Sequence, residues 1–412
     1  MVLNLQGGPT HIETFDPKMT APREYRAMFG ETKTAIPGVT FGSHLTGLAR
    51  LADRMAIVRS YRHGIGSHGQ ASAHVAAGGN STQANMGSLY SRIAGLTHPA
   101  TGIPLNAVLP PGAVDEKYGN LGAQVSRITS TGTLGSAYKP FDPSAGGEIV
   151  DNMRLNLAEN RFDDRRTLLA GLDSLRKRVE RTGAIASADT FQQQAFEVVV
   201  GGISEAFDLS KEPQSILDRY DTSHIDIPAA LYRKKNKNLL KQSPVCLGRQ
   251  MLMARRLVEA GCGFVTVTSA GWDMHGNAFG VDDGMPILGT AMDRAASAFI
   301  EDIEQRGMLD DVLLVITGEF GRTPRINKKG GRDHWGNLCT LAFAGGGLPL
   351  GTVIGQSNRT ASIPATEPVT SSQMLATIMH ALIDVPQLRL ATNIPADVVR
   401  ALTESKPIPQ LI

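Results

Sequence analysis

The sequence predicts an α/β fold, in the form of a three-layer α/β/α sandwich with a mostly parallel central sheet. Short runs of β-forming residues alternate with helical patterns along most of the chain. This alternation is typical of parallel sheets that carry helices on both faces. The chain has 412 residues, of which 42% are hydrophobic and 19% charged. That composition supplies enough apolar material for a sizeable core, and we expect residues 1–412 to form a single domain.

The N-terminal part supplies the first three expected strands, each a short and mainly apolar run. A helix is expected to begin at Ser67, because serine is a good N-cap. Residues 112–150 carry Gly, Ser, Thr and Pro without a clear period and predict a long loop. The strands are expected at 2–6, 55–59 and 106–109, and the helices at 45–53, 67–77 and 86–95.

The chain then changes to mostly helical patterns across residues 151–241, for example at 165–179 and 190–200. We expect a helical insertion there, packed on the main domain. The alternation of strands and helices resumes after it and continues to the C-terminal region. Strands are expected at 263–268, 312–317 and 338–344, and helices at 244–260, 286–306, 371–383 and near 394–403.

Charge and cysteine content exclude several classes of protein. Lys and Arg number 41 and Asp and Glu 39, so the net charge of +2 does not indicate a nucleic-acid or anionic-membrane partner. The cysteines Cys246, Cys262 and Cys339 have no zinc-thiolate spacing. The sequence has no apolar run of roughly 18 residues, so we expect no transmembrane helix. The sequence begins in a strand pattern, which indicates a cytoplasmic protein, or an exported one whose signal is missing here.

Polar side chains follow two of the expected strands at the point where each strand ends. Asp273 and His275 come after 263–268, and Glu319 comes after 312–317. Parallel strands present such groups at one edge of a sheet. Asp333 and His334 follow within a short loop. Carboxylate and imidazole donors of this kind predict a divalent metal site for Zn, Mn, Ca or Mg, although a surface turn would explain the Asp273 cluster as well.

A second polar cluster lies in the N-terminal part. His11 follows the first strand and is a further candidate ligand. Ser67 and His68 stand at a helix start, where free N–H groups stabilise an anion. Ser67 is therefore a candidate nucleophile or a plain N-cap, and His68 a candidate catalytic residue. Arg322 and Arg332 are candidates for gripping an anionic substrate, and each is equally explained as an ordinary ion-pair partner.

Several motifs together resemble the domain-of-unknown-function family 1501. They cover nearly the whole chain, and as a set they are specific. The family is similar to the alkaline-phosphatase and sulfatase superfamily, which implies an α/β/α sandwich with one or two divalent metals at the carboxyl edge of the sheet. The motifs are GGPTHIETFDPK (7–18), HGIGSHGQASAHVAAGG (63–79), WDMHGN (272–277), GEFGRTPRIN (318–327), GRDHW (331–335) and AFAGGGLPLGTVIGQSN (342–358).

The resemblance also implies roles for individual positions. Asp273, His275 and His334 match ligand positions, and Glu319 stands where the superfamily places an aspartate. The chain departs from the superfamily at Gln6, where a ligand aspartate is usual, and at Phe320, where a histidine is usual. No cysteine lies near residue 67, which argues against a formylglycine sulfatase.

These observations favour a metal-dependent hydrolase of phosphate or sulfate esters, acting on a small-molecule or glycan anionic substrate. Its metal would be held by Asp273, His275, Glu319 and His334, with Asp333 as a ligand or as the group that orients His334. The departures favour an alternative, a non-catalytic binding protein on an alkaline-phosphatase-like scaffold. A phosphomutase-like transferase is a third possibility.

Overall fold

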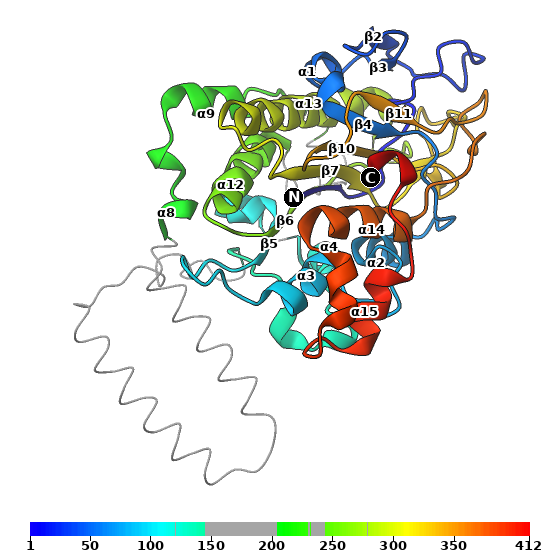
Figure 1. Ribbon diagram of the computed structural model, residues 1–412. Coiled ribbons are helices and arrows are strands. Elements are labelled where there is room, and N and C mark those ends of the chain that lie inside the picture. The colour runs from blue at the N-terminus through cyan, green and yellow to red at the C-terminus, as the bar shows by residue number, and fades with distance from the viewer. Residues whose placement is uncertain (120, 145–203, 230, 232–243, 278) are drawn as a thin grey trace, which may run out of the picture.

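The computed structural model describes residues 1–412 except 120, 145–203, 230, 232–243 and 278. A seven-stranded mixed sheet forms the middle layer, in the order β11-β4-β10-β7-β1-β6-β5 (Figure 1). Strand β10 runs antiparallel to its neighbours β7 and β4, and the other pairings in this sheet are parallel. The strands are β1 (Val2–Leu5), β4 (Met55–Val58), β5 (Asn106–Leu109), β6 (Phe264–Ser269), β7 (Leu313–Gly318), β10 (Leu341–Gly345) and β11 (Thr352–Ile354).

Helices cover both faces of this sheet (Figure 1). On one face, alternate strand residues such as Leu3, Val265 and Leu314 pack with α1, α12 and α13. On the other face, Val2 and Phe264 pack with α2, α3, α14 and α15. The period of two in each strand therefore supplies two cores, one for each helical layer. The helices are α1 (Thr46–Arg50), α2 (His68–Ala77), α3 (Met86–Ala94), α4 (Gly122–Ile128), α8 (Ser204–Phe207), α9 (Gln214–Tyr220), α12 (Leu247–Glu259), α13 (Val281–Gln305), α14 (Ser371–Leu382) and α15 (Ala396–Thr403).

The predicted α/β/α architecture is confirmed, and all six predicted strands are present. Several boundaries differ by a few residues, among them the starts of β10 and α13. Strand β10 begins at Leu341, and helix α13 begins at Val281, upstream of the start predicted at Pro286. Proline is frequent at helix starts, but here Asp282 and Asp283 occupy the first turn, where acidic side chains suit the helix dipole.

Several short helices and strands were not predicted from the sequence. Residues 112–150 were predicted to be a long loop, but the part that the structure describes contains α4, whose Val125 and Ile128 are buried. The additional strands are very short, so they carry almost no periodic signal. They are β11 in the main sheet and the two-stranded pairs β2 (Glu31–Lys33) with β3 (Thr40–Gly42) and β8 (Gly321–Arg322) with β9 (His334–Trp335).

The predicted insertion at 151–241 lies mostly outside the described residues, including the helical patterns at 165–179 and 190–200. Within its described part, α8 contacts α12, and α9 contacts both α12 and α13. The insertion and the single-domain organisation therefore stay predictions.

The carboxyl ends of β1, β6 and β7 lie side by side, because β1 pairs in parallel with both of the others. Gly7, directly beyond β1, approaches the next loop closely. A Cβ atom at Gly7 would stand 2.4 Å from the backbone nitrogen of Asp273, and its φ is +107°. Only glycine fits such a position without strain. This close approach brings three strand ends together around Asp273 and Glu319.

Candidate metal centre

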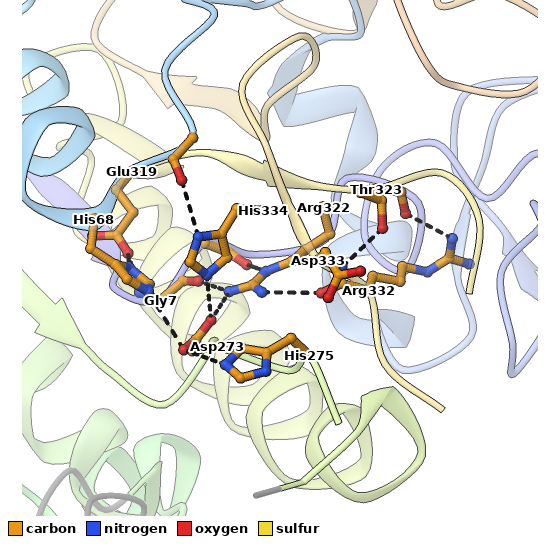
Figure 2. A network of polar contacts seen from close by, with 12 residues as sticks. Gly7, His68, Asp273, His275, Glu319, Arg322, Thr323, Arg332, Asp333 and His334 are labelled. Atoms are coloured by element: carbon orange, nitrogen blue, oxygen red, sulfur yellow. Dashed lines mark hydrogen bonds and ion pairs between the residues drawn. The ribbon is translucent and has the colours of Figure 1, made fainter. Parts of the chain in front are cut away.

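Six polar side chains reach this edge of the sheet from four parts of the fold (Figure 2). His68 is the first residue of α2, and Asp273 and His275 follow β6. Glu319 follows β7. The β8–β9 pairing, in which Arg322 lies opposite His334, returns the chain to the same place. The site is thus assembled from segments that are far apart in sequence.

Asp273 lies at the centre of this group. Nε2 of His275 and Nε2 of His334 each lie 3.1 Å from a carboxylate oxygen of Asp273, and Nε2 of His68 lies 3.5 Å away. Nη2 of Arg322 donates to Oδ1 of Asp273 at 2.6 Å. Figure 2 shows the rings turned toward this carboxylate. The Asp273 side chain is 33% exposed, so the group is open to solvent on one side.

The far side of two of these rings is held by oxygen atoms. Nδ1 of His68 lies 2.5 Å from Oε1 of Glu319, and Nδ1 of His334 lies 3.0 Å from the carbonyl oxygen of Gly66. Glu319 is 4% exposed and accepts two further hydrogen bonds, from the N–H of Gly7 at 3.0 Å and from the hydroxyl of Ser72. These contacts fix the orientation of the rings and present Nε2 to Asp273.

The charges of the group are strongly coupled. Hydrogen bonds to Asp273 and Glu319 raise the pKa of His68 to about 9. Burial opposes the ionisation of Asp273, but hydrogen bonds from His334 and His68 and the charge of Arg322 outweigh it. They hold the pKa of Asp273 well below its usual range. A carboxylate surrounded by imidazoles is therefore ionised at neutral pH and attracts a cation.

Among the described residues, one group has the geometry to hold a metal ion. It consists of His68, Asp273 and His334, whose ligand atoms all lie within 4.8 Å of one another. Two imidazoles and one carboxylate are ligands that suit transition metals and zinc. His275 and Glu319 contact members of this group but are not part of it.

Comparison with protein families assigns the chain to a family. Residues 1–408 match the family described as "Protein of unknown function (DUF1501)". The chain belongs to the DUF1501 family. No curated protein matches it. In the part of this DUF1501 protein that the structure describes, no helix is both long and apolar enough to cross a membrane.

Arg322 and Arg332 were each open to two interpretations. In the DUF1501 chain both are fully buried, at 0% exposure. Arg332 pairs with Glu13 at 3.1 Å. Arg322 bonds to Asp273 and to backbone carbonyls. The ion-pair interpretation therefore describes the contacts of both, and neither guanidinium faces solvent to meet a substrate.

Three other candidate residues lie around the group. Ser67 is exposed and is the N-cap of α2, but its side chain makes no capping hydrogen bond. Asp333 is exposed and accepts a hydrogen bond from Asn327 at 3.1 Å. The ring nitrogens of the adjacent His334 contact Gly66 and Asp273 instead. The structure therefore gives Asp333 no contact with the ring that it was expected to orient.

His11 is placed differently from the other candidates. Its Nε2 lies 2.8 Å from the carbonyl oxygen of Ala361, and burial lowers its pKa to about 4. It is not part of the group formed by His68, Asp273 and His334. Gln6 is likewise turned elsewhere, because its Nε2 donates to the carbonyl oxygen of Gln124 at 3.3 Å.

The sequence did not predict the groups that orient the His68 and His334 rings, either by contact with Nδ1 or by holding Glu319. Ser72 had a usable signal, since it lies four residues after His68 and so shares its helix face. The carbonyl of Gly66 and the N–H of Gly7 had none, because every residue except proline offers the same backbone groups. Only the folded chain shows which of them meet a side chain.

Proposed function

We propose that this protein is a metal-dependent hydrolase of phosphate or sulfate esters, with its cation held by His68, Asp273 and His334. The motif resemblance to the alkaline-phosphatase and sulfatase superfamily implies an α/β/α sandwich, and the mixed sheet with helices on both faces is consistent with that implication. The location of the polar group beyond the carboxyl ends of β1, β6 and β7 also supports the proposal, since open α/β sheets bind ligands at that edge.

One observation carries the metal assignment. Glu319 and the carbonyl of Gly66 each face the Nδ1 atom of a histidine ring. A carbonyl or carboxylate oxygen only accepts, so Nδ1 is the protonated nitrogen in the neutral rings of His68 and His334. Nε2 then carries a lone pair, yet it faces the oxygens of Asp273. Lone pairs that face one another need a cation between them, either protons or a metal ion.

A bound metal would polarise the ester oxygen and lower the pKa of a coordinated water or hydroxyl. The chain's own residues would supply a ligand, the nucleophile and the stabilisation of negative charge. His68 must lose a proton from Nε2 to act as a ligand, because its raised pKa keeps it protonated otherwise. Ser67 is the candidate nucleophile, since its hydroxyl is exposed, adjoins His68 and is not used in capping. The start of α2 would stabilise negative charge on the substrate.

Substrate charge has a second potential partner at the start of α2. Nε of Arg127 lies 3.9 Å from the position of a Cβ atom on Gly69, and Arg127 is exposed. Arg127 is therefore better placed than Arg322 to meet an anionic ester, because the donors of Arg322 are all directed to protein oxygens.

The test combines metal content with turnover. The protein is stripped with a chelator, reloaded with Zn²⁺, Mn²⁺, Ca²⁺ or Mg²⁺, and assayed with aryl phosphate and aryl sulfate esters. We expect bound metal and metal-dependent hydrolysis, both lost in His334→Ala and both kept in His224→Ala, which removes a histidine that is 61% exposed, pairs with Asp221 and is not part of the group. Undiminished metal in His334→Ala would refute the ligand assignment.

The alternative is a binding protein that uses the same cation for recognition. It is favoured by Gln6, which stands where a ligand aspartate is usual and whose side chain donates to the carbonyl of Gln124. Metal that binds normally without turnover of either ester would support this alternative. Loss of turnover with full metal content in Ser67→Ala would instead support hydrolysis with Ser67 as the nucleophile.

A further inference from the structure

We propose that Arg322 fills a second, oxygen-lined cation position beside the metal centre, so that the site takes one metal ion per chain. The inference rests on the proposed function, because it assumes that His68, Asp273 and His334 hold a cation. It assigns to Arg322 the role of a positioning residue, which acts through Asp273 and does not touch the substrate.

The surroundings of the Arg322 guanidinium are made of oxygen atoms. Nε donates to the carbonyl of Gly8 at 2.9 Å, and Nη1 donates to the carbonyl of Arg332 at 3.1 Å. Nη2 donates to the carbonyl of Gly7 and to Oδ1 of Asp273. Three carbonyls and one carboxylate are the ligand types that hard cations such as Ca²⁺ and Mg²⁺ use in proteins.

The arginine occupies this position permanently. Its side chain is 0% exposed, and its guanidinium carbon lies 5.5 Å from the centre of the Phe320 ring. A guanidinium remains protonated in proteins, so its charge does not depend on a supply of ions. A metal ion could enter the same place only if the buried side chain left it, which would deprive the guanidinium of its hydrogen bonds to the carbonyls of Gly7, Gly8 and Arg332.

Arg322 also determines the orientation of the Asp273 carboxylate. Oδ1 of Asp273 faces Arg322 and His334, and Oδ2 faces His68 and His275. The carboxylate is therefore held by a resident cation at Oδ1, while imidazoles face both of its oxygens. One cation position remains, at the imidazole side, and the orientation of its carboxylate ligand is set before any metal arrives.

Metal stoichiometry and chemical rescue test the proposal. The wild-type chain is reloaded with Zn²⁺ or Mn²⁺ and measured by elemental analysis, and we expect one ion per chain. In Arg322→Gly the metal should bind at least about tenfold more weakly. Millimolar guanidinium should restore most of that affinity, because it can refill the vacated position. The same guanidinium concentration should leave the wild-type affinity unchanged, and equimolar sodium chloride should rescue nothing.

If Arg322→Gly does not fold, Arg322→Lys provides the test instead. It keeps one charge but not the planar set of donors, so we expect one metal per chain, bound more weakly than in the wild type. Two ions per wild-type chain, an unchanged affinity in Arg322→Lys, or a folded Arg322→Gly that does not respond to guanidinium would each overturn this inference alone. No bound metal in the wild type would overturn the proposed function and this inference together.

Discussion

At the scale of single residues, the surroundings of a carboxylate decide what it can do for a neighbouring histidine. Glu319 is 4% exposed and meets Nδ1 of His68 at 2.5 Å. Asp333 directly precedes His334 but is exposed and bonded to Asn327. From the sequence, both carboxylates were candidate metal ligands. Only the buried one has its direction fixed, by the N–H of Gly7 and the hydroxyl of Ser72.

Glu319→Gln and Glu319→Ala test this difference. Glutamine keeps the shape and an acceptor for His68 but loses the charge, so we expect metal affinity to fall by about tenfold. Alanine leaves the N–H of Gly7 and the hydroxyl of Ser72 without an acceptor, and affinity should fall toward a hundredfold. Isothermal titration with Zn²⁺ measures both. Asp333→Asn is the matched control and should bind metal as the wild type does. An effect of Asp333→Asn as large as that of Glu319→Gln would contradict the assignment.

At the scale of elements, the site depends on two loops that lie against each other. The loop after β6 carries Asp273 and His275, and the segment before β9 lies along it. The N–H of Arg332 donates to the carbonyl of Met274 at 3.0 Å, and Nδ2 of Asn327 donates to the carbonyl of His275 at 3.1 Å. The spacing between His275 and His334 is therefore set in part by hydrogen bonds to the backbone of the loop after β6.

Gly331→Ala should force these loops apart. A Cβ atom there would stand 2.3 Å from the carbonyl carbon of His275 and 2.4 Å from the backbone nitrogen of Gly276. We expect a loss of about 1–3 kcal/mol in the free energy of unfolding and a weaker metal affinity, measured by denaturant titration and calorimetry. Gly307→Ala is the control. Its φ of +70° strains an alanine backbone, but its Cβ atom would stand in open space, so it should lower stability and leave metal affinity unchanged. Equal metal affinity in both variants would refute the coupling between the loops.

The elements themselves differ in how well the sequence predicts them. Strands β6 and β7 are six residues long and were predicted from runs of β-forming residues, and helix α12 is thirteen residues long and was predicted from its helical pattern. Strands β8 and β9 have two residues each and exist because Arg322 and His334 are paired across them. Such short pairings have no period to detect. His334 was nevertheless identified as a candidate, because its residue type suits a metal and not because its position was predicted.

At the scale of the whole molecule, sequence order predicts which residues reach the sheet edge but not which partner each of them contacts. Asp273 and Glu319 both follow parallel strands, and the topology of such sheets brings strand ends together. The sequence could not show that Glu319 turns to His68 while Asp273 turns to Arg322. These directions depend on contacts between segments roughly 50 and 250 residues apart, which no local pattern records.

The stability of the whole molecule should depend on pH through His11, which lies outside the metal group. Burial lowers the pKa of His11 from 6.5 to about 4, while Nε2 lies 2.8 Å from the carbonyl of Ala361. The unfolded chain therefore binds a proton more readily than the folded chain between these two values. Stability is fully present above pH 6.5 and is lost as the pH falls toward 4, by about 3 kcal/mol for this group.

His11→Gln removes the titration and keeps a donor that can reach Ala361. We expect the free energy of unfolding, measured by urea titration, to fall less in His11→Gln than in the wild type between pH 7 and pH 4. The difference between the two proteins should approach about 3 kcal/mol, because only the wild type must keep a proton off a buried ring. Metal-free protein must be used for both, since the groups around Asp273 also exchange protons when metal binds. Parallel curves for the two proteins over this range would mean that His11 exchanges its proton equally in both states.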